Sequence, residues 1–468
     1  MEPARKRKHS PVWEHFDLIS ANKVKCLLCA KELVYSNNTS SMLRHFRALH
    51  ADAQANTGAP TQMTRKQELD EALVSMIVGD TQPFTVVEDQ GFRNFVAKLD
   101  PTYVIPTRKA VKAMVKAKYE EEKQKAKLQL QSVTAVSLTS DMWTSINMDA
   151  YLALTCHYID ASTTLRSTVL GVEYFPDKHT AVNLAAVITS LMEEWGIGAK
   201  VTCLVTDGAA NMLACGRTLR LRHAICVAHT LNLIVKKCLD LTPVLSSIRT
   251  KARRLVGYFR SSTSAKEKLA VIQEQMGKPT LKLIQEVETR WNSTFQMLQR
   301  LVDQREPVGA ALSGLDSDIP VLTSEEYANI TGCLSILAPF HEATVELSEE
   351  KRVSCSKVIP LLKMIETLLH EETTRNTNPL ARELGEHLIK HVREKLHTLQ
   401  SSSIMSLPTL LDPRFKTIGF FSPTKADEAV RRLSSECANV IRENSHHPSS
   451  PSPSTSTSSH NEHHCGVI

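Results

Sequence analysis

The central region reads VTAVSLT at residues 133–139, YLALTCHY at residues 151–158 and LRSTVLGVEY at residues 165–174. Runs of this kind, rich in β-branched residues and separated by polar turns, are typical of strands. Apolar residues at helical spacing follow from Val182 to Trp195, and KVTCLVT at residues 200–206 is typical of a buried strand. The order β-β-β-α-β predicts an α/β layer in the middle of the chain.

Two aspartates come at the ends of strands in this predicted layer. Asp141 follows the first run, in TSDMWT at residues 139–144, and Asp207 follows the fourth, in TDGAANM at residues 206–212. Carboxylates at the ends of neighbouring strands can hold Mg²⁺, although two-metal phosphoryl transfer needs one further acid. The alternative is that both side chains cap strand ends and bind no metal.

A second pattern near the N-terminus has the spacing of a metal site. Cys26 and Cys29 form CLLC, and His45 and His50 follow after fifteen and four intervening residues. Two thiolates and two imidazoles can close a tetrahedron around Zn²⁺, and four protein ligands indicate a structural ion. Strands at residues 23–25 and 32–35 and a serine-capped helix at residues 40–50 predict a ββα finger. Chance spacing of the four residues is the alternative.

Composition places the rest of the chain among globular intracellular proteins. The 468 residues exceed one domain of about 150 residues, and the hydrophobic (42%) and charged (23%) fractions are ordinary. The sequence has no apolar run long enough to span a membrane and no secretory leader, so we expect no membrane partner. Residues 1–52 carry nine Lys or Arg against five Asp or Glu, which favours a polyanionic partner. The basic run at residues 5–8 indicates nuclear import, phosphate contact or a solvated tail.

The N-terminal pattern resembles a BED-type zinc finger, with SPVWEHF at residues 10–16 ahead of the cysteine pair and the two histidines. That family binds DNA. The resemblance implies that Trp13 and Phe16 pack the finger core, that His15 lies at the surface, and that one structural Zn²⁺ is held by Cys26, Cys29, His45 and His50. A helix bearing Asn38, Ser41, Arg44 and Arg47 would enter the major groove of double-stranded DNA. For each arginine, base readout, phosphate contact and a solvated role stay open.

The central motifs resemble the conserved blocks of hAT transposases and their domesticated ZBED relatives. The resemblance is carried by DMWT at residues 141–144, TDGAANM at 206–212 and CVAHTLNL at 226–233. It implies an RNase H-like core with a large all-α insertion, and the later blocks RWNST at 290–294 and LDPRFK at 411–416 agree with this. The Trp291 position stacks near unpaired DNA in active relatives; a buried core tryptophan is the alternative.

The third acid of that family lies in a Ser-Glu-x-x-Phe-Ser block of the dimerisation region, and no such block is found here. Glu342 and Glu346 lie on an apparent helix and are expected to be exposed, while Glu436 has only the Ser-Glu pair. We therefore expect Asp141 and Asp207 to be vestigial and a homodimer to be doubtful. Cys226 and His229 could supply half a metal site, although core packing is the better interpretation.

Lysines line one face of a helix ahead of the core. Lys109, Lys112 and Lys116 could follow DNA phosphates, or form a solvated face balanced by the glutamates at residues 120–122. The expected division is a finger at 11–52, a linker at 53–65, a helical hAT-like DNA-binding domain at 66–131, an RNase H-like core at 132–240, a helical insertion at 241–442 and a disordered tail at 443–468.

The sequence thus predicts a multidomain α+β protein. Its expected function is that of a nuclear, zinc-dependent, sequence-specific DNA-binding protein derived from a hAT transposase, regulating transcription with chromatin or transcription partners and without enzymatic activity. One alternative is an active Mg²⁺-dependent transposase that completes its site from Glu342, Glu346 or a second chain. Another is a SUMO ligase, raised by the family resemblance without a sequence mechanism.

Overall fold

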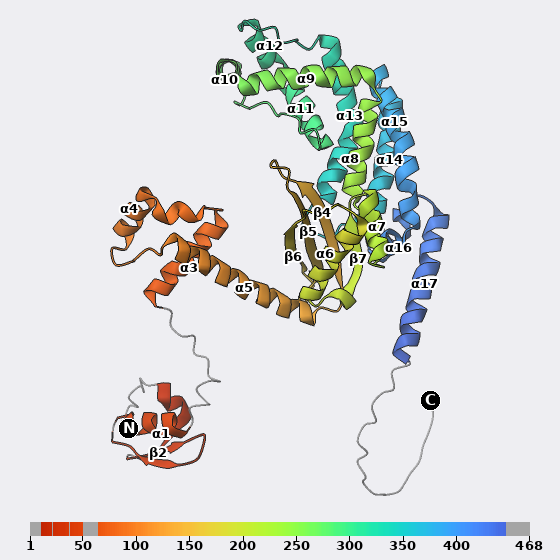
Figure 1. Cartoon of the computed structure of the whole chain (residues 1–468). Coiled ribbons are helices and arrows are strands. Elements are labelled where there is room, and N and C mark those ends of the chain that lie inside the picture. Colours follow the sequence, from red (N-terminus) through yellow and green to blue (C-terminus); the bar gives the residue numbers. More distant parts are fainter. Residues whose placement is uncertain (1–10, 21, 37, 50–63, 446–468) are drawn as a thin grey trace, which may run out of the picture. The chain divides into compact units, whose positions relative to one another are not determined.

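The computed structural model describes residues 11–20, 22–36, 38–49 and 64–445 (Figure 1). The basic run at residues 5–8, His50, most of the expected linker and most of the expected tail lie outside these residues. The chain divides into two compact units, residues 1–124 and 125–468, and each is described by itself.

The finger in the first unit is a small antiparallel sheet followed by a helix. Its elements are η1 (Pro11–His15), β1 (Phe16–Ser20), β2 (Lys23–Cys26), β3 (Glu32–Val34) and α1 (Ser40–Leu49), and the strand order is β1-β2-β3. The predicted ββα arrangement is confirmed, with β1 as an additional strand that pairs Phe16 with Cys26. Strand β1 gives no period-2 signal in the sequence because Phe16 is its only buried residue.

Side chains from every element fill the finger core. Its buried members are Val12, Phe16, Val24, Cys26, Met42 and Phe46. A core of six residues buries too little apolar surface to hold a finger folded, so a further source of stability is required.

Three α-helices and a 3₁₀ turn complete the first unit, the last helix continuing into the second. They are α3 (Arg65–Gly79), η2 (Phe84–Glu88), α4 (Gln90–Leu99) and α5 (Arg108–Ser132). Thr64 begins α3 with a capping box, in which its hydroxyl accepts from the Gln67 amide and the Gln67 side chain accepts from the Thr64 amide. Leu73, Ile77, Val87 and Val111 form the small core that joins these elements.

A five-stranded sheet opens the second unit. Its strands are β4 (Val136–Thr144), β5 (Ala150–Ile159), β6 (Leu165–Tyr174), β7 (Val201–Thr206) and β8 (His223–Ile225), in the order β6-β5-β4-β7-β8. The first three strands form the predicted antiparallel meander, and β7 and β8 run parallel to β4. The predicted α/β layer is confirmed; β8 was not expected, because three residues are too few for a period to appear.

The two faces of the sheet are covered by different layers. Helices α6 (Ala181–Glu194) and α7 (Ala210–Thr218) share a core with Leu138, Leu154 and Leu204 of the strands. Cys203 and Val205, which alternate with Leu204 along β7, pack instead against the core of the helical region. Strand β7 is therefore packed against another layer on both faces, as expected for a central parallel strand.

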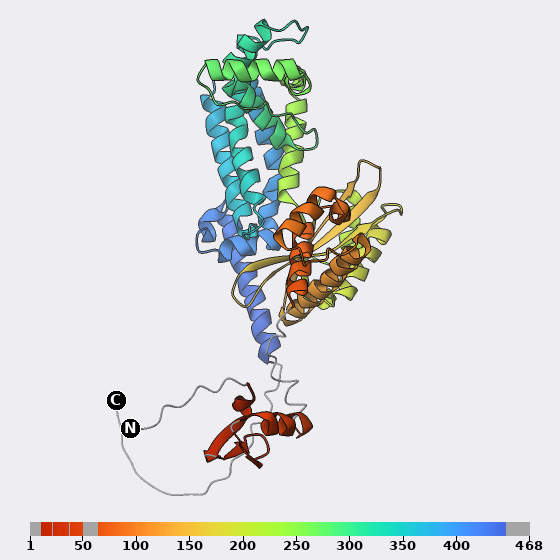
Figure 2. The ribbon, with the colours of Figure 1, turned by 90° about the vertical axis from the view of Figure 1, so that its left-hand side faces the viewer.

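The remainder of the second unit is helical. Its elements are η3 (Gly198–Lys200), α8 (Val227–Asp240), α9 (Pro243–Ser261), α10 (Thr263–Gln275), α11 (Trp291–Asp303), α12 (Arg305–Ser313), α13 (Ser324–Leu347), η4 (Cys355–Lys357), α14 (Val358–Arg375), α15 (Pro379–Leu396), η5 (His397–Ser401), α16 (Ser403–Leu411), η6 (Lys416–Gly419) and α17 (Pro423–Ser445). Helices α8, α13, α14 and α15 pack side by side, and α9 to α12 gather at the end of this bundle away from the sheet (Figures 1 and 2).

Two prolines lie inside helices. Pro339 is in the middle of α13 and Pro408 is near the end of α16. Proline lacks the amide hydrogen that would bond the carbonyl four residues earlier, so each costs its helix one hydrogen bond. Helix α13 continues through Pro339 because Ile336, Leu337 and Phe340 on either side of it are buried in the core.

Replacing Thr323 by alanine should lower the unfolding free energy by about 1 kcal/mol, because Thr323 caps α13. Its hydroxyl accepts from the Glu326 amide at 3.1 Å, and the Glu326 carboxylate accepts from the Thr323 amide at 2.8 Å. Urea unfolding followed by tryptophan fluorescence would measure the loss. Ser434→Ala, inside α17, removes a hydroxyl that bonds only its own helix and should change stability by less than about 0.5 kcal/mol. Equal effects of the two changes would contradict the capping role.

In the part of the chain that the structure describes, none of the helices combines the length and the apolar character that crossing a membrane requires.

Candidate metal centre

A tight turn positions the two cysteines of the finger. Cys26 ends β2, and its carbonyl accepts from the Ala30 amide while its own amide donates to the Lys31 carbonyl, both at 2.9 Å. Ala30 takes a positive φ of 59°, which reverses the chain directly after Cys29. This knuckle brings both thiols to the side of the sheet that α1 covers.

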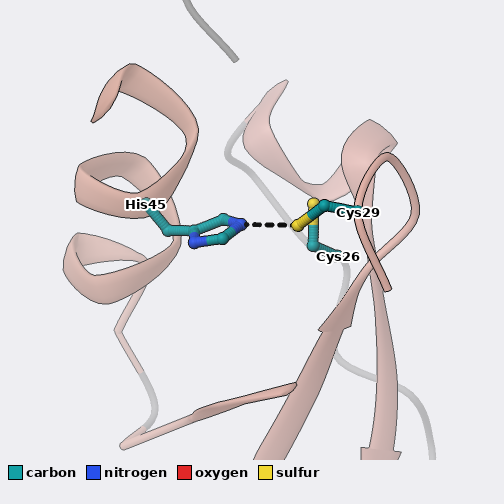
Figure 3. Close-up of side chains that lie close together, drawn as sticks. All are labelled: Cys26, Cys29 and His45. Atoms are coloured by element: carbon teal, nitrogen blue, oxygen red, sulfur yellow. Dashed lines mark hydrogen bonds between the residues drawn. The ribbon is translucent and has the colours of Figure 1, made fainter. Parts of the chain in front are cut away.

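Three donor atoms converge there (Figure 3). The ligand atoms of Cys26, Cys29 and His45 all lie within 4.8 Å of one another, and Cys29 Sγ is 3.3 Å from His45 Nε2. Ligands at about 2.3 Å from a tetrahedral zinc ion lie roughly 3.8 Å apart, so this spacing fits Zn²⁺. Cys26 and His45 are buried and Cys29 is exposed.

Aromatic rings pack against both His45 and His15, and His15 is not part of the cluster. Phe16 contacts His45 edge to face, with ring centroids 5.8 Å apart. His15 stacks on Phe46 at 4.5 Å and is half-buried, which matches its expected place outside the ligand set. The fourth expected ligand, His50, is outside the described residues. The cluster therefore presents two sulfurs and one nitrogen, a donor set suited to a soft or borderline cation.

The four residues expected to touch DNA differ in whether their side chains already make hydrogen bonds within the finger. Asn38 Oδ1 accepts from the Ser40 amide at 3.1 Å, and Ser41 Oγ donates to the Val34 carbonyl at 3.1 Å. Both side chains thus help to fasten the start of α1. Arg44 is exposed on α1, and Arg47 lies on the same helix with its side chain outside the described part.

The expected lysine face lies on α5. Lys109, Lys112 and Lys116 are all exposed, and no ion pair is formed by them within the described residues. The balancing glutamates pair with a different lysine: Lys118 Nζ lies 3.4 Å from Glu121 and 3.2 Å from Glu122. The three lysines therefore keep their charge available for a partner.

The core acids belong to neighbouring strands: Asp207 directly follows the end of β7, whereas Asp141 lies within β4 and not at its end. Thr139 pairs with Val205 in the parallel ladder, so Asp141 and Asp207 each follow a paired residue by two positions. The Asp141 carboxylate accepts a hydrogen bond from the Met142 amide at 2.9 Å, and the Asp207 carboxylate accepts one from the Ala209 amide at 3.1 Å. Among the described residues the finger holds the one cluster of three possible metal ligands, so the structure gives Mg²⁺ no support.

Among the described residues, the candidates for a third acid form no cluster with Asp141 and Asp207. Glu342 is exposed on α13, Glu346 is ion-paired with Lys357, and Glu436 is half-buried on α17. Cys226 and His229 are half-buried at the start of α8, Cys226 as its N-cap residue. Neither belongs to a three-ligand cluster in the described part of the chain.

Trp291 is buried, with 2% of its surface exposed, at the start of α11. Its ring meets Phe295 and His341 edge to face, with centroids 6.3 Å and 6.4 Å away. A base can stack only on an exposed ring, so the core alternative holds in this conformation.

The helical region contains a buried ionic network that no pattern in the sequence indicates. Glu286 accepts from Arg249 Nη2 at 2.9 Å and Arg253 Nε at 2.8 Å, and Thr294 also donates to it. Burial raises the pKa of Glu286, but the hydrogen bonds from Thr294 and both arginines outweigh it and hold that pKa below its usual value. No signal of periodicity or motif could have found this pairing, because its members lie up to 37 residues apart.

Protein-family models match both the finger and the region of the sheet and helices. Residues 10–51 match the BED zinc finger, residues 139–233 the ZBED1 RNase-like domain and residues 224–334 the ZBED1 RNase-like helical domain. These matches cover the cysteine–histidine cluster, the sheet with both core acids, and the helices from α8 into α13.

Three relatives illustrate the similarity. The human zinc finger BED domain-containing protein 4 is 26% identical over 92% of this chain and 41% of its own length. The putative transcriptional regulator tpeD of Talaromyces stipitatus is 27% identical over 78% and 50%. The putative AC transposase of Zea mays is 28% identical over 56% and 36%. The chain thus spans half or less of the length of these relatives.

The finger geometry, the sheet order and the family matches all indicate the same family. The chain is a ZBED-like protein, in which a BED-type zinc finger precedes an RNase H-like core related to hAT-family transposases.

Proposed function

We propose that this chain is a nuclear, zinc-dependent, sequence-specific DNA-binding protein, derived from a hAT transposase, that regulates transcription. The observation that carries the proposal is the convergence of Cys26, Cys29 and His45 within a matched BED finger. A relative named as a putative transcriptional regulator supports the regulatory role. The partners that we propose for this role are chromatin or transcription proteins.

In this proposal His50 is the fourth zinc ligand. The ion supplies the cross-link that a finger core of six buried residues lacks, and it keeps α1 against the sheet. The chain's own residues then act on DNA: α1 presents Arg44 and Arg47 to the major groove, while the exposed lysines of α5 contact phosphates.

We also propose the domain division that the sequence predicted. The finger at 11–52 is separated by a linker at 53–65 from a helical domain at 66–131, a core at 132–240, a helical insertion at 241–442 and a tail at 443–468. The small separate cores of the finger and of α3 to α5 support the first two boundaries.

Selection from a random pool of duplex DNA tests the function directly. The full chain with zinc should enrich one short sequence, and the enriched duplex should bind at least about a thousandfold more tightly than a scrambled one. Equal affinity for both duplexes would contradict sequence-specific recognition.

Replacing Arg44 by alanine should cost about 1–3 kcal/mol of binding to the selected duplex and relax the preference at one base position, since Arg44 is exposed on the proposed recognition helix. Fluorescence anisotropy with the selected duplex and its single-base variants would measure this. Arg431→Ala, an exposed arginine of α17, is the matched control and should leave the affinity unchanged. A uniform loss on every duplex would assign Arg44 to phosphate contact instead.

We propose that the core is not catalytic. The supporting observation is the adjacent pair Asp141 and Asp207 without a third acid in a common cluster of the described residues. Incubation with Mg²⁺ and duplex DNA that carries the selected sequence should produce no nicks. Nicking that is lost in Asp207→Asn would establish the transposase alternative.

A further inference from the structure

A groove at the end of the helical bundle is lined by cations and apolar side chains. It lies between the end of α9, helix α10 and residues 280–283, and encloses about 290 Å³. Arg260, Lys266 and Lys282 bring positive charge to it, and Phe259, Leu269 and Leu283 give it apolar walls. None of the residues that line it is acidic.

The segment that carries Lys282 is fastened at three carbonyls, although it has no regular secondary structure. The buried Gln273 donates to the Leu281 carbonyl at 3.0 Å and to Gln304 at 2.7 Å. Arg300 donates to the Lys282 carbonyl at 2.7 Å, and Arg260 to the Leu283 carbonyl at 3.5 Å. The groove is therefore held in shape without a ligand, which lowers the cost of binding one.

The surroundings of the groove are strongly basic. Residues 243–290 carry ten Lys or Arg against four Asp or Glu, a net charge equal to the +6 of the whole chain. One of the four acids, Glu286, is already neutralised by two arginines. Six exposed cations form no ion pair with a carboxylate of the described residues. They are Arg254, Arg260, Lys266, Lys268, Lys282 and Arg290.

We propose that this groove and the cations beside it bind the sugar-phosphate backbone of double-stranded DNA, as a second contact that does not depend on the finger. A phosphate fits among the exposed side chains of Arg260, Lys266 and Lys282. The exposed cations beyond the groove match a polymer whose charges repeat along its length, and a single small anion would leave them unused.

The salt dependence of DNA binding by the full chain tests this. A triple variant, Arg260→Gln, Lys266→Gln and Lys282→Gln, should bind a 30-base-pair duplex about tenfold or more weakly at 0.15 M salt. Its slope of log K against log salt should be shallower by about 2 to 3, since each phosphate contact contributes about 0.9. The control removes three exposed cations of the same unit, Arg382→Gln, Lys390→Gln and Arg431→Gln, and should keep the wild-type slope. Equal slopes of the two triple variants would overturn the proposal.

Chemical protection locates the contact without any substitution. Duplex DNA should slow acetylation of Lys266 and Lys282 by an amine-reactive ester at least about fivefold, while Lys390 reacts at the same rate with and without DNA. Protection by an acidic peptide or by tripolyphosphate, but not by DNA, would overturn the proposal.

A finger variant separates the two contacts. In Cys26→Ser the protection of Lys266 and Lys282 should persist, because the groove belongs to the other compact unit. If that variant loses sequence preference but keeps lysine protection, both proposals stand. If Cys26→Ser keeps full sequence preference, the function proposed for the finger fails and the groove is unaffected.

Discussion

Replacing Cys26 by serine is expected to remove the bound zinc and to weaken binding to the selected duplex by at least roughly a thousandfold, the usual gap between specific and non-specific binding. Cys26 is fully buried in the finger core, where its thiol lies within 4.8 Å of the other two ligand atoms. A serine hydroxyl is a poor ligand for zinc, and without the ion a core of six residues cannot hold the helix on the sheet.

Metal analysis of the purified full chain and anisotropy with the selected duplex would measure both losses. Cys437→Ser is the matched control, because Cys437 is an exposed cysteine on α17. The control should keep one zinc per chain and unchanged affinity. Chelation of the wild-type chain should reproduce the Cys26→Ser result, and readdition of zinc should restore binding. A Cys26→Ser chain that lacks zinc but still selects the same duplex would contradict the role given to the finger.

Replacing Glu286 by alanine should destabilise the second unit by about 3–5 kcal/mol, because it leaves Arg249 buried without its carboxylate partner. The Glu286 side chain is 2% exposed and that of Arg249 is 9% exposed, so water cannot replace the lost contact. Among the described residues, the carboxylate contact that Arg249 keeps is the one with Asp240 at 2.9 Å, and Asp240 is largely exposed. Hydrogen bonds from Arg249 and Arg253 also join Glu286 to α9.

Urea unfolding followed by the fluorescence of Trp291 and the other tryptophans of this unit would measure the loss. Glu288→Ala changes an exposed glutamate two residues away and should alter stability by less than about 0.5 kcal/mol. A loss below 1 kcal/mol for Glu286→Ala would show that the network adds little to stability.

The same network predicts a dependence on pH. The pKa of Glu286 is lowered in the folded state, so its contribution is fully present above the unfolded value of about 4.3 and is lost as the pH falls through the folded pKa. The difference in unfolding free energy between wild type and Glu286→Ala should therefore be constant from pH 6 to 8. It should shrink only below about pH 4. A difference that shrinks between pH 6 and 8 would contradict the lowered pKa.

Local patterns in the sequence predicted the elements that make local contacts. The meander, the helix after it and the buried strand β7 were predicted within a few residues. Each of these elements buries one or both of its faces, so its apolar residues recur with the period of a strand or a helix. Strands β1 and β8 were missed, since β1 buries one residue and β8 has three. Proline by itself favours a break in a helix, but α13 continues through Pro339, because packing on both sides of it outweighs one lost hydrogen bond.

The sequence by itself determined that a finger, an α/β layer and a helical region follow one another, and it named the cysteines and histidine that the fold brings together. Spacing along the chain was enough there, since these ligands lie on one hairpin and the helix next to it. Only the tertiary structure decided that Trp291 is buried, that Glu286 joins two arginines from α9, and that Arg260, Lys266 and Lys282 share one groove. These contacts join residues that no periodic pattern relates, and their free energy comes from burial and charge pairing that arise only when the helices pack.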